Sequence, residues 1–480
     1  MFNTKDKLIN RVFEIFGEIC SIPHGSGDME KIADYCVGFA NKNHLKYYRD
    51  TANNVIIYKN GTADLTLSAP VILQGHLDMV CQKTTDSDFN FLSDPLCLFT
   101  DGDLLGAKNT TLGADNGIAV AYILAILESD CIIHPPIEAV LTTDEEIGML
   151  GAKALNFDKI TAKRMINIDS EEDDVLTVSC AGGMKFSINF PLKRKKVNGT
   201  KIGVCVKDFK GGHSGVEIDK NRTNADVFVG ALLKKLQEIT PFYLLDINGG
   251  DKGNAIVNRC EFSVCSLEPD TFITATQNFL KGAKITLSDT EPNFSFDIFK
   301  GDYGEYDAFT EDTQNDVLFL LNTFPNGVVE MSKEIEGLVE TSLNLGILKT
   351  ENDTVSALIS LRSNKQKGME ELFDKLRSLC SRTAGSYNVG GYYPPWEFKN
   401  NSKLQKIYYD SYKDFFGKEP QVAAIHAGLE CAVFADKIEG LDCISMGPNL
   451  FDVHTVDERL SITSAKSTFD LLLEILKNCK

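Results

Sequence analysis

Histidines and carboxylates follow several short apolar runs of this sequence, and both residue types can bind metal ions. His76 and Asp78 come just after the run 71–73, and Asp115 stands at the mouth of a long apolar stretch. The same pattern returns further along the chain with Asp144, Glu145, Glu146, Asp169 and His454. Imidazole nitrogens and carboxylate oxygens are both ligands of zinc. The sequence therefore offers a complete donor set for a metal centre.

The composition of this set favours two metal ions over one. Two histidines and three carboxylates, one of them shared, suit a pair of zinc ions about 3.5–4 Å apart. Asp115, with small neighbours, is the expected bridging carboxylate. Glu145 and Glu146 point in different directions, so one can bind metal while the other stays free as a general base. Asp78 is two residues from His76 and can hold its second ring nitrogen.

Each of these signals is weak when it is taken alone. A His-x-Asp pair is usually a hydrogen-bonded pair without catalytic meaning, and acids before a helix usually form a solvated N-terminus. Asp115 alone could be a helix N-cap. Their joint placement favours a metal site, because the carboxyl ends of the strands meet at one edge of an open α/β sheet. We therefore expect these segments to converge there.

The first part of the chain, 1–181, alternates strand and helix patterns as βαβ units do. The strand candidates are the short apolar runs 55–58, 71–73, 137–141 and 165–168. Residues 117–127 are apolar nearly all round and too long for a strand, which predicts a buried helix. We read segment 1–16 as the first helix and not as a targeting peptide. These patterns predict an α/β fold with a mostly parallel sheet covered by helices on both faces.

The pattern changes near residue 181. Strand-rich stretches at 202–206, 255–264 and 355–361 then interleave with helices near 224–238, 270–281 and 367–381. Segment 386–396 has the composition of a linker, and the first pattern returns after it with 421–425, 443–446 and 464–477. We therefore expect a discontinuous domain, 1–181 and 391–480, interrupted by an inserted α+β domain, 182–390. The insert is long enough to hold two lobes.

Composition narrows the classes of partner. The formal charge of −19 disfavours nucleic acid and anionic membranes as partners. No run approaches the roughly 18 apolar residues of a membrane helix. The thirteen cysteines include no Cys-x-x-Cys pair and accompany no export signal, so we expect reduced thiols in a cytoplasmic protein.

The order of the motifs resembles that of the M20 family of metallopeptidases. The chain reads His-Leu-Asp-Met-Val from residue 76, Gly-Ala-Asp-Asn-Gly from 113, Asp-Glu-Glu from 144 and Asn-Ile-Asp from 167, before the late His454. Gly-Gly-His-Ser-Gly at 211–215 and Ile-His-Ala-Gly-Leu-Glu at 425–430 resemble the aminoacyl-histidine dipeptidase (peptidase D) branch. The resemblance covers nearly the whole chain, from Ile22-Pro23-His24 to the C-terminal region.

The resemblance implies two zinc ions per subunit, with Co²⁺ or Mn²⁺ as alternatives because carboxylate-rich sites accept several metals. It places His76, Asp115 and Asp169 on one ion and Asp115, Glu146 and His454 on the other. It makes Glu145 the general base and Asp78 the residue that orients His76. It also implies a cis peptide bond after Asp115.

The inserted domain is implied to be a lid, and many members of the family form homodimers through it. His213 would stabilise the developing oxyanion, often across the dimer interface. Arg362 would anchor the free carboxylate of the substrate, and Asn254 and Gly428 would also bind substrate. The remaining histidines His24, His44 and His134 are expected to be structural, and His426 to be a pocket residue.

The implied function is a cytosolic two-zinc dipeptidase acting on Xaa-His (carnosine-like) and other unblocked dipeptides. An aminoacylase or a tripeptidase on the same scaffold is the nearest alternative. A non-catalytic, metal-stabilised binding protein is another, although a binder has no need of a spare base such as Glu145. Neither a Gly-x-Gly-x-x-Gly motif after a strand nor a Walker loop occurs, which argues against nucleotide binding.

Overall fold

The computed structural model describes residues 6–480, and the chain divides into two compact units. The first comprises the chain up to Cys180 together with Trp396–Ala424 and Leu429–Lys480. The second comprises Ala181–Pro395 and Ile425–Gly428. Residues 1–5 of the predicted first helix lie outside the described residues, and the observed helix begins at Lys7.

The first unit is built on an eight-stranded sheet in the order β1-β2-β6-β3-β7-β21-β8-β20. Its strands are β1 (Lys46–Arg49), β2 (Val55–Lys59), β3 (Val71–His76), β6 (Ile137–Thr142), β7 (Arg164–Asn167), β8 (Val175–Cys180), β20 (Gln421–Ile425) and β21 (Asp442–Ser445). The helices of the unit are α1 (Lys7–Cys20), α2 (Glu30–Lys42), α3 (Ala114–Glu128), α4 (Leu150–Ala154), α9 (Lys403–Phe416), α10 (Glu430–Lys437) and α11 (Ile462–Asn478). Two short 3₁₀ helices, η1 (Ala63–Leu65) and η2 (Phe157–Lys159), join them.

The centre of this sheet is parallel, as the sequence predicted. Strands β6, β3, β7 and β21 run in the same direction, whereas β1 and β2 pair antiparallel beside β6. Every residue of β3 and β6 is buried. Burial on both faces explains why these strands read as continuous apolar runs without alternation.

Helices cover both faces of the sheet. Successive side chains of a strand point to opposite faces, and Gly75 of β3 faces α3 so closely that a Cβ there would meet Asn116. The neighbouring Gln74 points the other way and donates a hydrogen bond to Glu430 at the start of α10. Helix α3 is buried along most of its length, with α1 against it and its Tyr122 ring stacked on Phe469 of α11. The predicted buried helix is therefore confirmed.

A small four-stranded sheet completes the first unit. It runs in the order β22-β23-β5-β4 and consists of β4 (Leu98–Asp101), β5 (Leu104–Ala107), β22 (Leu450–Phe451) and β23 (Arg459–Ser461). Pairing of β23 with β5 brings the C-terminal part of the unit to the N-terminal part.

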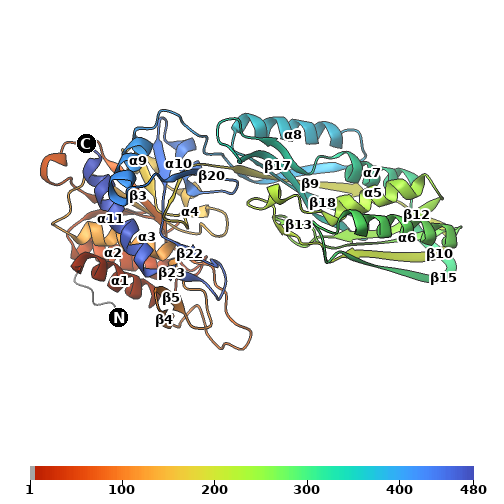
Figure 1. The fold of residues 1–480 in the computed structure, drawn as a ribbon, viewed down its shortest axis with the longest axis horizontal. Helices are drawn as coiled ribbons and strands as arrows, with labels where there is room; N and C mark the ends of the chain where they lie inside the picture. The colour runs from red at the N-terminus through yellow and green to blue at the C-terminus, as the bar shows by residue number, and fades with distance from the viewer. Residues whose placement is uncertain (1–5) are drawn as a thin grey trace. The chain divides into compact units, whose positions relative to one another are not determined.

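The second unit is an antiparallel sheet with helices packed against it (Figure 1). The sheet runs β15-β10-β14-β12-β17-β18-β9-β19, and β16 pairs with β17. Its strands are β9 (Gly182–Pro191), β10 (Arg194–Lys207), β12 (Phe242–Gly249), β14 (Cys260–Ser266), β15 (Ser295–Phe309), β16 (Gly327–Met331), β17 (Val339–Thr350), β18 (Thr354–Ser363) and β19 (Ser386–Tyr393). The short pair β11 (Gly212–His213) and β13 (Ala255–Ile256) stands apart. The helices are α5 (Ala225–Gln237), α6 (Pro269–Thr286), α7 (Glu311–Thr323) and α8 (Gln366–Cys380), with η3 (Ile218–Lys220) before them.

The structure departs from the sequence predictions in three places, all in the second unit. The segment 386–396, predicted as a linker, forms strand β19 over most of its length and pairs with β9. The predicted strand 255–264 is divided into β13 and β14. One continuous sheet spans the unit, where the sequence left room for two separate lobes.

Over residues 6–480, no helix combines the length and the apolar character that a membrane crossing requires. The thirteen cysteines are all free thiols in the described chain, and most of them are buried.

Candidate metal centre

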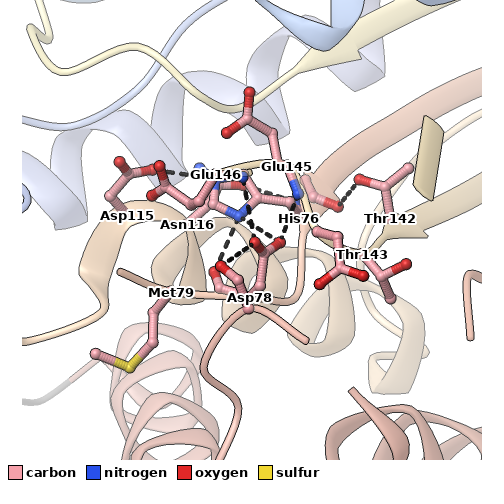
Figure 2. A network of polar contacts seen from close by, with 12 residues as sticks. His76, Asp78, Met79, Asp115, Asn116, Thr142, Thr143, Glu145 and Glu146 are labelled. Atoms are coloured by element: carbon pink, nitrogen blue, oxygen red, sulfur yellow. Dashed lines mark hydrogen bonds and ion pairs between the residues drawn. The ribbon is translucent and has the colours of Figure 1, made fainter. Parts of the chain in front are cut away.

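The carboxyl ends of three parallel strands meet where the sequence predicted a metal site (Figure 2). His76 is the last residue of β3, Glu145 and Glu146 follow β6, and Asp169 follows β7. Asp115 is the second residue of α3. Asp78 and His454, after β3 and β22, complete the group. Hydrogen bonds and ion pairs of 2.9–3.5 Å connect these residues to one another.

The carboxylate of Asp115 divides the group into two halves. Its Oδ1 lies 3.2 Å from Nε2 of His76, and the same nitrogen lies 3.5 Å from Oδ1 of Asp169. Its Oδ2 lies 3.0 Å from Nε2 of His454, which is also 3.0 Å from Oε1 of Glu146. Each oxygen of Asp115 thus faces one imidazole, and each imidazole faces a further carboxylate.

The electrostatics of the group suit a cation. Burial alone would lower the pKa of His76, but Asp169 and Asp115 outweigh it and raise that pKa well above its usual value. Hydrogen bonds with Asp115 and Glu146 raise the pKa of His454 to about 11. Burial raises the pKa of Asp169 to about 6. In the described chain these carboxylates form ion pairs with histidines alone, so the group concentrates negative charge that divalent cations would neutralise.

The donor types also fit. Single donor atoms of His76, Asp115 and Glu146 lie within 4.8 Å of one another, so donors from both sides of Asp115 are close enough to bind metal. Imidazole nitrogen and carboxylate oxygen are ligands that zinc, manganese and cobalt all accept. The residues present can therefore hold metal.

Asp78 supports the group from below, where Figure 2 shows it beneath His76 and Glu146. Its carboxylate accepts hydrogen bonds from the backbone N–H groups of Glu145 and Glu146, at 2.9 and 3.2 Å, and from Ser26 Oγ at 2.9 Å. Nδ1 of His76 lies 3.0 Å from the Asp78 carbonyl oxygen and 3.4 Å from its Oδ1. Asp78 therefore fixes the loop after β6 as well as the ring of His76. The sequence predicted only the second of these contacts.

The turn that carries Asp115 is held by its neighbour Asn116. Oδ1 of Asn116 accepts a hydrogen bond from the backbone N–H of His76 at 3.1 Å, and its Nδ2 donates to the carbonyl of Ile168 at 2.6 Å. The peptide bond between Asp115 and Asn116 is cis, as the family resemblance implied. One side chain thus connects α3 to both β3 and β7.

Glu145 differs from its neighbour Glu146. Its side chain forms no hydrogen bond or ion pair with another described residue, and Figure 2 shows its carboxyl group pointing away from Asp78. Burial raises the pKa of Glu145 well above its usual range, and the charges of Asp169 and Glu146 raise it further. A carboxyl group in this position is available to exchange protons.

A buried polar network lies behind the candidate ligands, and its strand residues stand two to four positions before them in the sequence. Oε2 of Glu430 accepts hydrogen bonds from Thr142 Oγ1, at 2.6 Å, and from Gln74 Nε2. Oε1 of Gln74 accepts from Asn167 Nδ2 at 2.5 Å. Burial raises the pKa of Glu430 to about 8. The network joins the ends of β3, β6 and β7. In the sequence, Glu430 is distinguished only as part of the motif at 425–430.

In the second unit, His213 occupies β11 beside β13. Its Nδ1 accepts hydrogen bonds from the backbone N–H groups of Gly215 and Val216, at 3.2 and 3.3 Å. The proton of the neutral ring therefore resides on Nε2, which remains a donor. Burial and the charge of Arg362 lower the pKa of His213, which favours the neutral ring.

The other residues predicted for the lid also belong to the second unit. Asn254 accepts the N–H of Ser214 next to His213 through its backbone carbonyl, at 2.9 Å. Arg362 donates to Tyr393 Oη at 3.1 Å, while its buried Nε has no hydrogen-bond partner among residues 6–480. His426 is buried between Ser342 and Asn364, and burial and Arg362 lower its pKa to about 3. Gly428 ends the segment 425–428.

Comparison with known proteins gives consistent matches. Residues 72–478 match the profile of Peptidase family M20/M25/M40. The cytosol non-specific dipeptidase of Escherichia coli (strain K12) is 36% identical over 472 residues, covering 97% of each chain. The crystal structure of aminoacylhistidine dipeptidase from Vibrio alginolyticus has a TM-score of 0.88 at 34% identity, covering 99% of this chain and 98% of that one. Aminopeptidase PepT from Bacillus cereus, at 14% identity and a TM-score of 0.58 over 98% of both chains, shares the fold.

Asp78→Asn should weaken zinc binding about 10- to 100-fold, because an amide nitrogen cannot accept the N–H groups that Asp78 now holds. Isothermal titration of the metal-free protein with Zn²⁺ measures the effect. The matched control is Asp103→Asn, since Asp103 accepts hydrogen bonds from Ser461 and Thr463 at the start of α11. Equal zinc affinities in the two variants would contradict the role given to Asp78.

Proposed function

This chain belongs to peptidase family M20/M25/M40 and is a metallodipeptidase of that family, and we propose that it holds two zinc ions that share Asp115. His76 and Asp169 would complete one metal site, and Glu146 and His454 the other. The substrates would be unblocked dipeptides, with Xaa-His dipeptides among them.

The way in which Asp115 is shared carries this proposal. A carboxylate that serves one ion needs one oxygen near the other ligands, whereas here each oxygen faces its own imidazole, and each imidazole faces a further carboxylate. The ligand sets on the two sides have the same composition, one histidine and one acid in addition to Asp115. A symmetric pair of this kind suits a two-metal hydrolase.

When bound, the zinc ions would polarise the scissile carbonyl group and lower the pKa of a water molecule. Glu145 takes a proton at its free carboxylate from the attacking water, whose oxygen bonds to the carbonyl carbon, and delivers that proton to the departing amine nitrogen as the C–N bond breaks. Asp78 keeps Glu145 in place through its backbone N–H, so the side chain can move a proton without moving the loop. The backbone N–H of Glu146 also donates to Asp78, and the Glu146 side chain faces His454.

His213 is proposed to stabilise the oxyanion that develops on the substrate carbonyl. Its Nδ1 is occupied by two backbone N–H groups, which leaves the Nε2–H as a fixed donor. A neutral donor whose ring is already oriented costs little reorganisation during the reaction.

Arg362 is proposed to bind the free carboxylate of the dipeptide, with Asn254 and Gly428 contributing to the same pocket. A planar guanidinium group matches a carboxylate with two hydrogen bonds. The buried Nε of Arg362 lacks a partner within the described chain, so a donor is available for this task. The names of the two most similar relatives reported above, a non-specific dipeptidase and an aminoacylhistidine dipeptidase, support unblocked dipeptides as substrates.

Two further assignments are part of the proposal. The protein would act in the cytoplasm, which agrees with the cytosolic name of the Escherichia coli relative and with the free cysteines of the described chain. It would also form a homodimer through the second unit. Sedimentation or light scattering of the full chain measures that assembly.

Removal of metal should abolish hydrolysis of an Xaa-His dipeptide, and added zinc should restore it. The same assay with the N-acetylated dipeptide and with a tripeptide distinguishes a dipeptidase from an aminoacylase and from a tripeptidase. Cleavage of only the acetylated substrate would indicate an aminoacylase, and preference for the tripeptide a tripeptidase. Zinc binding without cleavage of any of these substrates would favour a non-catalytic binding protein.

Glu145→Gln should retain zinc and lose about 10²- to 10⁴-fold in kcat, the usual contribution of a general base. Metal content is measured by atomic emission and turnover with the same dipeptide. Glu14→Gln, at an exposed position of α1, is the control and should behave as wild type. Turnover of Glu145→Gln close to that of wild type would exclude Glu145 as the base.

His213→Asn should lower kcat about 10²- to 10³-fold with little change in zinc affinity. An asparagine Oδ1 can accept the N–H groups of Gly215 and Val216 as Nδ1 does, but the donor at the Nε2 position is lost. His44→Ala, at an exposed histidine, controls for the loss of an imidazole. An unchanged kcat for His213→Asn would show that the ring only accepts the N–H groups of Gly215 and Val216 and takes no part in the reaction.

A further inference from the structure

Glu458 accepts hydrogen bonds from four consecutive backbone N–H groups of another segment. Its Oε2 lies 2.8 Å from the nitrogen of Leu112 and 3.1 Å from that of Gly113. Its Oε1 lies 2.8 Å from the nitrogen of Ala114 and 3.4 Å from that of Asp115. The glutamate is only 2% exposed. Both carboxylate oxygens are therefore committed to one short stretch of chain.

This stretch comprises Leu112, the N-cap Gly113 and the first two residues of α3, and the N–H groups at the start of a helix lack partners within it. The N-cap residue Gly113 has a left-handed φ of 70° and no side chain to accept them. Glu458 supplies the missing acceptor from a distant part of the first unit. A carboxylate is also favoured there by the helix dipole.

Asp115 is thereby held on two sides. Glu458 fixes the chain up to and including the N–H of Asp115, and Asn116 fixes the chain after it through His76 and Ile168. A side chain between two fixed backbone points has little freedom to shift. The direction of the Asp115 carboxylate follows from these two restraints.

Glu458 also belongs to the segment that carries His454. His454 stands four residues before Glu458, and its Nε2 lies 3.0 Å from Oδ2 of Asp115. Glu458 accepts the backbone N–H of the same aspartate. One short segment thus contacts both the side chain and the main chain of Asp115. Displacement of this segment would change the distance between a shared ligand and its imidazole partner.

We propose that Glu458 is a positioning residue of the metal centre, which sets the Asp115 carboxylate between the two metal sites by holding the N–H groups of residues 112–115. This rests on the proposed function, since it assumes that Asp115 is the shared ligand. Glu458 itself binds neither metal nor substrate. Its effect is transmitted through the backbone of the turn before α3.

Glu138 provides a matched comparison within the same unit. It is 6% exposed and accepts hydrogen bonds from the N–H groups of Thr161 and Ala162 and from the Thr161 hydroxyl. It resembles Glu458 in burial and in its backbone partners, but those partners carry no candidate ligand. Loss of either carboxylate should cost comparable stability, whereas only Glu458 should affect the metal centre.

The experiment compares wild type, Glu458→Gln and Glu138→Gln as full-length, metal-free proteins titrated with Zn²⁺. We expect the zinc Kd of Glu458→Gln to rise about 10- to 100-fold and that of Glu138→Gln to stay at the wild-type value. Hydrogen exchange should show faster exchange of the N–H groups of 112–115 in Glu458→Gln alone. The visible spectrum of the Co²⁺-substituted protein should also change only in that variant.

The outcomes separate this inference from the proposed function. Wild-type zinc binding with equal Kd values in both variants, or with equal losses in both, overturns the positioning role and leaves the dipeptidase untouched. A wild type that binds no zinc overturns both. If Glu458→Gln does not fold, Glu458→Asp decides, because it keeps the charge but withdraws it by one methylene. A wild-type zinc Kd for Glu458→Asp, with unchanged exchange at 112–115, overturns the positioning role.

Discussion

Repulsion between closely spaced, partly buried carboxylates is the constraint on which the first unit depends. Asp115, Glu146 and Asp169 are brought together by two histidines, with Asp78 directly behind them. Charges of the same sign at such distances are costly in a weakly polar interior. The unit offsets this cost with imidazoles and with backbone N–H groups aimed at the acids. The parallel strands bring the carboxylates to one edge of the sheet, and the hydrogen-bond donors around the carboxylates stabilise them there.

Much of this arrangement could be predicted from the sequence because the strands are buried on both faces. The run 71–73 of β3 is apolar because it is buried on both faces, and the candidate ligands His76 and Asp78 follow within a few residues of its end. Helix α3 was equally clear, since its apolar residues surround the axis. The different directions of the Glu145 and Glu146 side chains could also be predicted, because the two residues are adjacent in the sequence.

Other features left no local signal. Strand β19 is exposed and rich in glycine and tyrosine, so its pairing with β9 stabilises it without an apolar pattern. The hydrogen bonds of Glu458 and Glu430 join residues more than 280 positions apart, from the glutamate to Ala114 or Thr142. A glutamate in a polar segment looks solvent-exposed until the fold brings N–H groups to it. Contacts of this kind depend on the tertiary structure, and short-range sequence patterns do not contain them.

Because the second unit is inserted into the first, the first unit can be completed only after most of the second has been translated. Ribosomes release the chain from its N-terminal end, and domains generally fold as they emerge. His76, Asp115, Glu146 and Asp169 appear before the second unit, whereas His454 appears after it. The nascent first unit therefore lacks one imidazole, strand β21 and the partner of the turn before α3 while the second unit is completed. The proposed ligand set is complete only after the segment that follows the second unit has been translated, so a growing chain does not contain the whole proposed metal site while the second unit is being made.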